Sequence, residues 1–348
     1  MTMKNYKKLT ASALALSMLL TSTGVVNAES NNNEEQTQTQ QSKDNQNEQD
    51  DNKASEDKDN TNELKNKIYV EGADLNEQQA DETQYELGAK DGYKKYEIST
   101  DDVSEYTGGT YDFIHSSATI VPKKFGKGVD VEIVTPDNIT RITQEQYTNA
   151  SITSGIENAK IKVTSIDKVS GEGALTGIYK GLEEEGIEVD KQDVQNASKE
   201  MDDLASINEE QAENDNDNYS DKALNNAVAD MKEQVANKKA DGDDVSRDDV
   251  EKVVNITLKA KGLDKVLSDN QKNKLVDIVY NTSQSKAMQK DPKSVAQQSK
   301  KLKDNLSDSV KKFNDDNDGI LQNLWNGFKS FLQKIIEFIS SIFGKLFG

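Results

Sequence analysis

The amino-acid sequence predicts an α/β domain with a small mixed sheet, followed by an all-helical extension and a C-terminal amphipathic helix. Between residues 64 and 188, short β-branched runs alternate with helical patterns, which is typical of layered α/β folds. From residue 189 to residue 290, only helical patterns occur. In residues 319–348, apolar side chains recur at alternating spacings of four and three, which places them along one side of a helix.

Two segments precede the α/β domain. Residues 1–28 are typical of a secretory signal peptide, because lysines precede a short apolar run and small side chains end the segment at Ala28. A retained anchor helix is the alternative, but the apolar run is short and contains hydroxyl groups. Residues 29–63 are almost wholly polar and acidic, so they cannot bury enough apolar surface to fold, and we expect a disordered spacer.

The composition restricts the possible partners. The formal net charge is −20, and such an acidic surface repels phosphate backbones, so we expect no nucleic-acid partner. No cysteine occurs, which excludes disulfides and thiolate metal ligands. The terminal residues 319–348 differ in sign from the rest, because they carry three lysines and one glutamate.

Strands are expected at intervals through the α/β domain, and two of them should pair as a hairpin. Gly126 and Gly128 form a turn signal between two β-rich runs, the second of which alternates apolar and polar residues. This pattern predicts two antiparallel strands joined by a short turn. The expected strands span residues 67–71, 93–98, 111–121, 129–135 and 159–169.

Capping residues predict where the helices of the α/β domain begin. Asn76 and Thr143 each have glutamine three positions later, which is the pattern of a capping box. The expected helices span residues 76–87 and 143–154, a helical turn opens at Thr100, and a further apolar helix face ends at Gly186.

The helices after residue 188 are weakly amphipathic, so we expect them to pack on each other or on the α/β domain. Residues 291–318 should form a polar helix and linker, with a loop at 314–318. Within residues 189–290, the apolar helix faces include residues 194–204, 223–235, 250–258 and 275–279.

Four sequence runs and the aromatic-rich terminus carry a family resemblance. The runs are GADL near Ala73, GGTYDFIHSSATIVP, GKGVDVEIVTPDNITRIT and QYTNASITSGIENAKIKVTSIDKVSGEGALTGIYKGLE. Together they resemble the YpuA-like family of secreted proteins from Gram-positive bacteria, a domain of unknown function (DUF1002). The resemblance covers most of residues 65–290 and implies secretion and a shared fold. It carries no catalytic residue, cofactor or substrate.

Two stretches resemble ligand-binding loops but lack essential residues. Residues 171–177 (GEGALTG) follow an expected strand, as a phosphate-binding turn would. Thr176 stands where the dinucleotide fingerprint needs glycine, and no lysine and hydroxyl pair follows, so close helix packing explains these glycines better. Residues 314–319 resemble the start of a calcium loop, but Trp325 stands where a closing glutamate is required. We expect a helix-capping loop there instead.

The other polar candidates support no site assignment. The single histidine, His115, cannot build a metal site alone, and we expect a structural or surface role. Thr107, Tyr111 and Tyr147 could line a groove, although core and edge packing is the favoured interpretation. A carboxylate pair for hydrolysis cannot be picked from a chain so rich in acids. The sequence therefore assigns no catalytic, cofactor-binding or metal-binding residue, and no cofactor.

The terminal helix is the most informative functional element. Its wide apolar face, its tryptophan and its lysines favour docking to a membrane surface, whereas the recurring polar residues oppose a span. Self-association in the manner of a coiled coil is the second interpretation, and packing back onto the body is the third. The expected membrane or partner contacts are Leu321, Leu324, Trp325, Phe328, Phe331, Leu332, Ile335, Ile339, Ile342, Phe343 and Leu346.

These features predict a secreted, non-catalytic protein of the cell envelope, associated with the outer face of the cytoplasmic membrane or with the cell wall. The alternative is an extracellular enzyme, for example a carboxylate-based hydrolase of wall polymers, whose site the sequence does not reveal. The physiological ligand and the oligomeric state do not follow from the sequence.

Overall fold

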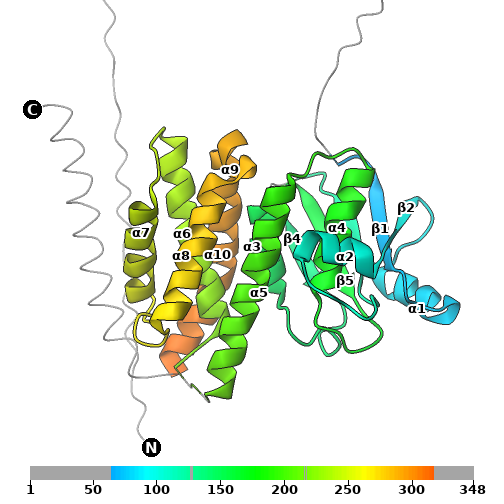
Figure 1. Ribbon diagram of the computed structural model, residues 1–348, viewed down its shortest axis with the longest axis horizontal. Coiled ribbons are helices and arrows are strands. Elements are labelled where there is room, and N and C mark those ends of the chain that lie inside the picture. The colour runs from blue at the N-terminus through cyan, green and yellow to red at the C-terminus, as the bar shows by residue number, and fades with distance from the viewer. Residues whose placement is uncertain (1–63, 126–127, 215, 217, 317–348) are drawn as a thin grey trace, which may run out of the picture. The chain divides into compact units, whose positions relative to one another are not determined.

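The fold is described from a computed structural model, which describes residues 64–316 except residues 126, 127, 215 and 217. The expected signal peptide, spacer and terminal amphipathic helix, residues 1–28, 29–63 and 319–348, lie outside the described residues. The described part contains a five-stranded mixed sheet with helices, followed by further helices (Figure 1). The predicted combination of a small α/β sheet and a helical extension is therefore confirmed.

Four of the five strands run in the same direction. The sheet has the order β2-β1-β3-β5-β4, in which β3 (Ser117–Pro122) is antiparallel to both of its neighbours, β1 (Lys67–Gly72) and β5 (Ala159–Thr164). β2 (Tyr93–Ile98) is parallel to β1, and β4 (Asp130–Ile133) is parallel to β5. The carboxyl ends of these four strands meet at one edge, which we call the carboxyl edge. Ligands of open α/β sheets commonly bind at such an edge.

The expected hairpin between the third and fourth strands is wrong, because β5 lies between β3 and β4. Ile161 of β5 pairs with Ile120 of β3 on one side and with Val131 of β4 on the other. Ile161 and Val163 are fully buried, as is typical of a strand in the middle of a sheet. The long-range pairing of β5 thus outweighs the local turn signal.

β3 begins later than the β-rich run 111–121 suggested, and β5 ends before Val169. Residues 111–116 form a loop instead, and the Asp74 carboxylate accepts a hydrogen bond of 2.7 Å from the Ile114 amide. Beyond β5, the Ser165 carbonyl accepts a hydrogen bond of 2.8 Å from the Asn138 side chain. Backbone groups at both places bond to side chains rather than to a neighbouring strand, which ends the ladder.

Helix α4 (Glu172–Glu184) packs closely on one face of the sheet. Ile68 and Val70 of β1 are fully buried beneath it. A Cβ atom at Gly181 would lie 2.8 Å from Val70 Cγ2 and 2.9 Å from Ile68 Cγ2, so only glycine permits this approach. Helix α2 (Thr100–Thr107) packs against α4 and continues this layer.

Helix α1 (Glu77–Leu87) packs on the sheet as well, and a small separate core contains Tyr69 of β1 and Leu87. Tyr69 follows Ile68 in the strand and therefore faces the side opposite to α4. The capping box predicted at Asn76 is present, and so is the one at Thr143, which begins α3 (Gln144–Thr153).

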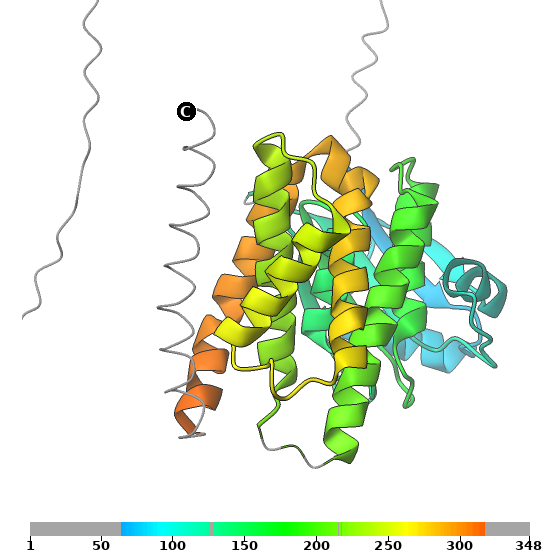
Figure 2. The ribbon, with the colours of Figure 1, turned by 60° about the vertical axis from the view of Figure 1, so that its left-hand side comes forward.

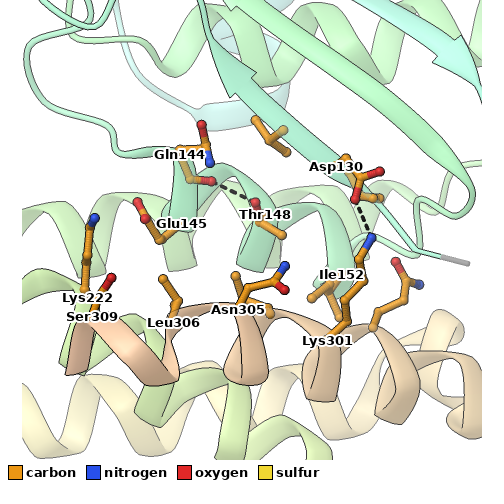
Figure 3. Close-up of a pocket in the computed structure, with 14 residues that line it drawn as sticks. Asp130, Gln144, Glu145, Thr148, Ile152, Lys222, Lys301, Asn305, Leu306 and Ser309 are labelled. Atoms are coloured by element: carbon orange, nitrogen blue, oxygen red, sulfur yellow. Dashed lines mark hydrogen bonds and ion pairs between the residues drawn. The ribbon is translucent and has the colours of Figure 1, made fainter. Parts of the chain in front are cut away.

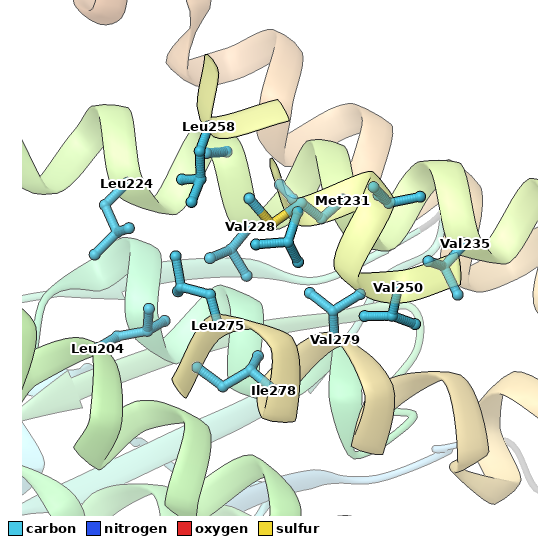
Figure 4. Packing of buried hydrophobic residues seen from close by; sticks show 14 of the residues in the cluster. Leu204, Leu224, Val228, Met231, Val235, Val250, Leu258, Leu275, Ile278 and Val279 are labelled. Atoms are coloured by element: carbon cyan, nitrogen blue, oxygen red, sulfur yellow. The ribbon is translucent and has the colours of Figure 1, made fainter. Parts of the chain in front are cut away.

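The rest of the described chain is helical and has its own apolar core. Figure 4 shows this core, in which Leu224, Val250 and Leu275 converge from three helices. Helices α6 and α10 lie side by side (Figure 2). The helices are α5 (Lys191–Glu213), α6 (Asp221–Ala240), α7 (Arg247–Ala260), α8 (Asp269–Gln284), α9 (Lys286–Lys290) and α10 (Pro292–Asp316). α10 extends to Asp316, so the loop expected at 314–318 is wrong for its first part, and the remainder lies outside the described residues.

Helices α3 and α5 join the two cores. Val194 and Met201 of α5 belong to the core beneath the sheet, whereas Leu204 and Ile207 belong to the helical core. Ile152 of α3 also contributes to the helical core. The sheet and the helical extension therefore share α3 and α5 as a common layer.

A fully buried ion pair lies in this shared layer. The Lys232 ammonium group of α6 donates hydrogen bonds to Glu200 Oε1 of α5 at 2.5 Å, Thr153 Oγ1 of α3 at 2.7 Å and the Asn149 carbonyl at 2.9 Å. Thr153 in turn donates to Glu200 Oε2 at 2.5 Å. Burial lowers the pKa of Lys232, although the Glu200 carboxylate acts in the opposite direction. Three helices are thus tied together by one cation.

A carboxylate at the start of α6 makes stability depend on pH. Burial, with a further contribution from the charge of Glu145, raises the pKa of Asp221 to about 6. The ordinary pKa of aspartate is near 4. The folded state therefore binds an extra proton between pH 4 and pH 6, and the folded state loses stability as the pH rises through this window.

Replacing Asp221 with asparagine should therefore stabilise the protein at neutral pH, by about 1–2 kcal/mol. Asparagine can still accept the hydrogen bond of 3.0 Å that the Asn225 side chain donates to Asp221 Oδ1. Urea unfolding of both forms at pH 4 and pH 7.5 gives the difference, which should grow with pH. Asp248→Asn, an exposed first-turn position of α7, is the matched control. A difference that is equal at both pH values would contradict the assignment.

Candidate functional site

The residues that the sequence proposed for membrane or partner contact, from Leu321 to Leu346, all lie outside the described residues. The candidate site of the described body must be built from other side chains. Thr107 and Tyr111 line a cavity, whereas Tyr147 is fully buried and donates a hydrogen bond of 2.5 Å to the Gly171 carbonyl. The packing interpretation is thus confirmed for Tyr147, and the groove interpretation holds for Thr107 and Tyr111.

We call this space the α2–α5 cavity, and its volume is about 530 Å³. The end of α2 and the following loop, residues 105–111, form one wall, and residues 195–202 of α5 form another. Glu172, the first residue of α4, lies between them. Gly108 has φ +72 and ends α2, so the chain can turn there, and the Gly109 amide donates to Thr107 Oγ1 at 3.1 Å.

Arg141 holds the carboxylates of this region together. Its guanidinium group contacts Glu172 at 2.6 Å, Asp202 at 2.8 Å and Glu209 at 2.9 Å. Burial alone would lower the pKa of Arg141, but the hydrogen bonds with these carboxylates outweigh burial and raise it. The planar guanidinium suits this role, because it can donate to several carboxylates in fixed directions.

Two buried oxygen atoms at the cavity wall have no hydrogen-bond partner among the described residues. They are Glu172 Oε2 and Ser198 Oγ. Glu172 is 9% exposed and Ser198 is 8% exposed, so bulk water does not replace the missing partners. Burial raises the pKa of the nearby Tyr111, and the charges of Glu172 and Asp202 add to this effect. The cavity wall is therefore rich in carboxylates, and two oxygen atoms buried in it have no hydrogen-bond partner among the described residues.

His115 lies at the carboxyl edge, just before β3. Its Nδ1 atom is 2.9 Å from Asp167 Oδ2, and its ring centroid is 4.6 Å from that of Phe113. Asp167 also accepts a hydrogen bond of 3.3 Å from Gln79. Among the contacts of the described residues, His115 has this carboxylate but no serine or threonine hydroxyl, so no nucleophilic triad is formed.

The glycines of residues 171–177 allow close packing around the start of α4. Gly171 has φ +115, and a Cβ atom there would lie 2.8 Å from Tyr147 Oη. A Cβ atom at Gly177 would lie 3.2 Å from Val70 Cγ1. Glu172 brings a carboxylate to the start of α4, where a phosphate would have to bind. The sequence interpretation of these glycines as sites of close helix contact is confirmed.

A second cavity, of about 350 Å³, lies between α3 and α10. Figure 3 shows Glu145 and Thr148 of α3 facing Asn305 and Leu306 of α10 across it. At one end, Asp130 pairs with Lys301 and, at 2.8 Å, with Lys123. Burial alone would raise the pKa of Asp130, but these lysines lower it. The charge of Asp130 is therefore matched by two lysines, and the cavity follows the seam between α3 and α10.

Sequence reasoning did not find the α2–α5 cavity as a site. Its polar side chains come from separate elements, and each is one of many similar residues in the chain. One signal was present, because Arg141 is one of only two arginines among 43 basic residues. In a chain that otherwise uses lysine, an arginine indicates a position that needs several directed hydrogen bonds.

Comparisons with known proteins give a family but no activity. A family model described as "Protein of unknown function (DUF1002)" matches residues 71–302. A protein of Bacillus subtilis (strain 168) named "Uncharacterized protein YpuA" is 31% identical over 287 residues, which cover 80% of this chain and 88% of that protein. No solved structure matches the chain.

Proposed function

We propose that this chain, which belongs to the DUF1002 family of proteins of unknown function as its sequence motifs predicted, is an exported, non-catalytic cell-envelope protein. In this proposal, the protein attaches to a membrane surface through residues 319–348. The contrast between two surfaces carries this proposal. The sequence of residues 319–348 predicts a continuous apolar stripe, whereas large hydrophobic side chains are exposed at only three separate positions of the described body. These are Tyr85 in α1 and Phe113 and Phe125 in loops.

Peripheral attachment agrees with the charges. Among the described residues, none of the helices combines the length and apolar character that crossing a bilayer requires. Lys329, Lys334 and Lys345 would face anionic headgroups, while the acidic body would be repelled from them. The arrangement favours a helix that lies in the interface with the body held outside it. Export would follow from residues 1–28 and would place this surface outside the cytoplasmic membrane.

A non-catalytic role is supported by the state of the carboxylates in the α2–α5 cavity. Hydrolysis of a glycosidic bond by two carboxyl groups needs one of them as a proton donor. Glu172 and Asp202 instead both contact the Arg141 guanidinium group, at 2.6 Å and 2.8 Å, so both are engaged in ion pairs. The alternative, a hydrolase of wall polymers, therefore receives no support from this arrangement.

Co-sedimentation with lipid vesicles tests the attachment. We expect the full chain to pellet with anionic vesicles at physiological salt, and a chain lacking residues 319–348 to stay in the supernatant. The double variant Leu332→Asp, Ile339→Asp should also lose binding, because it places charges in the apolar stripe. Gln322→Asp, Gln333→Asp adds the same charge on the polar side and should retain most of the binding. If the full chain does not bind vesicles but forms oligomers, the result supports self-association and overturns membrane attachment.

A further inference from the structure

We propose that the folded body makes a second contact with the anionic membrane surface, through Phe125 and the exposed lysines Lys124 and Lys160. These three residues, which we call the Phe125 tip, lie where β3 ends and β5 begins, at the edge of the sheet opposite to the carboxyl edge. This inference rests on the proposed function, because it takes the same membrane surface as the partner.

Phe125 is 90% exposed, which is the largest exposed fraction among the large hydrophobic side chains of the described residues. Single exposed hydrophobic residues are common, so exposure alone assigns no partner. The neighbouring charges distinguish Phe125 from the other two positions. Tyr85 and Phe113 each have an acidic residue next to them in the chain, whereas Phe125 lies in the run KKFGKG, which contains three lysines and no acid.

One residue holds both ends of the loop that carries Phe125. The Asn158 carbonyl accepts a hydrogen bond of 2.7 Å from the Lys123 amide, and Asn158 Oδ1 accepts one of 3.2 Å from the Gly128 amide. Asn158 has φ +53, a left-handed conformation that asparagine adopts more readily than most residues. The base of the loop is therefore fixed to the start of β5, while Phe125 stays exposed.

Lys124 and Lys160 carry the charge of the Phe125 tip. Both are exposed, and among the described residues neither has a carboxylate within ion-pair distance. The loop that contains Asn158 adds one exposed acid, Glu157. An anionic lipid surface suits this combination, because it attracts unpaired lysines and accepts an aromatic ring among its headgroups.

The terminal segment is long enough to meet the same surface. Lys301 of α10 contacts Asp130, which begins β4 directly after the loop. α10 ends at Asp316, about 22 Å farther along the helix axis. A helix over residues 319–348 would be about 45 Å long, so it can lie on the surface that Phe125 touches. Two contacts would fix which edge of the body faces the membrane, while the acidic remainder stays outside the interface.

Moving the single tryptophan of the chain tests the contact. The double variant Trp325→Phe, Phe125→Trp places it at the Phe125 tip, and Trp325→Phe, Tyr85→Trp places it at a control position that is 85% exposed. On adding anionic vesicles to the full chain, we expect the emission of the first variant to shift to shorter wavelength and to be quenched by lipids brominated near the headgroups. The emission of the second variant should not change.

Affinity gives a second measurement of the aromatic contact. Phe125→Ala should weaken binding of the full chain to anionic vesicles by about threefold to tenfold, because the ring no longer enters the interface. Phe125 is too exposed for this change to disturb the core. Tyr85→Ala is the control and should leave the affinity unchanged.

The lysines are tested in the same assay. Lys124→Gln with Lys160→Gln should weaken binding by about threefold to tenfold at physiological salt, and by less at high salt, because salt screens the attraction. The matched control is Lys259→Gln with Lys265→Gln, which removes two exposed lysines from the helical extension and should have a smaller effect.

The outcomes separate this contact from attachment through residues 319–348. If Trp325 of the parent chain responds to vesicles and the Phe125→Trp chain does not, the contact is overturned and the attachment stands. If only the Phe125→Trp chain responds, the contact stands and the attachment through the terminal helix is overturned. A response of neither overturns both. Emission of the Phe125→Trp chain that is already at short wavelength without vesicles would show that protein covers this position, and would also overturn the contact.

Discussion

Replacing Lys232 with methionine is expected to destabilise the protein by about 3–5 kcal/mol. Lys232 is fully buried, and its ammonium group is the partner of Glu200, which is 1% exposed. Methionine fills a similar volume but leaves the Glu200 carboxylate buried with a hydrogen bond from Thr153 and no cation. An uncompensated buried charge is among the most destabilising changes that one substitution can make.

A double variant separates the missing charge from lost packing. Lys232→Met with Glu200→Leu should recover most of the lost stability, because both buried charges are then removed together. Urea unfolding measured by circular dichroism gives the free energies. The control is Lys180→Met, which breaks a partly exposed pair with Asp102 at 2.7 Å and should change stability by about 1 kcal/mol or less. Equal losses in Lys232→Met and Lys180→Met would show that the buried pair is not essential.

Replacing Gly72 with alanine should destabilise the protein by about 3 kcal/mol. Gly72 ends β1 at the carboxyl edge, and a Cβ atom there would lie 2.3 Å from the Ile114 carbonyl oxygen. The opposing atom belongs to the backbone, so no side-chain rotation can relieve the contact. The strand and the loop that carries His115 must move apart.

The matched control is Gly186→Ala, at a position with φ +75 where a Cβ atom would meet open space. Its cost should be about 1–2 kcal/mol, from backbone strain alone. His115 is the single histidine of the chain, so its ring resonances in NMR spectra report the loop directly. Gly72→Ala should shift them and Gly186→Ala should not. Unchanged His115 resonances together with full stability in Gly72→Ala would refute the close contact.

The sequence predicted local features of this fold well. Asn76 and Thr143 were identified as capping residues, and the helices after them begin where expected, because a capping box involves neighbouring residues only. The change from α/β to helix near residue 189 was also readable from periodicity. The neighbours of β3 and β4 were not readable, because both strands pair with β5, which comes after both in the chain.

The candidate site was harder to predict than the fold. The contacts of Arg141 and the approach of α5 to α4 bring Glu172, Ser198 and Asp202 to the same cavity. No local sequence pattern marks these residues. The family resemblance could not help, since the matching family has no assigned activity. Thr107, Tyr111 and Tyr147 were noted in the sequence as possible groove residues, with packing as the favoured interpretation, because a tyrosine in a core and a tyrosine in a groove have the same local pattern.

The emission of Trp325 tests membrane attachment most directly. It is the single tryptophan of the chain and lies within the proposed apolar stripe, so its fluorescence comes from that surface alone. On adding anionic vesicles to the full chain, we expect the emission to shift to shorter wavelength and to be quenched by lipids brominated near the headgroups, as for a helix at the interface. Emission that is unchanged by vesicles, and insensitive to the brominated lipids, would contradict the proposed attachment.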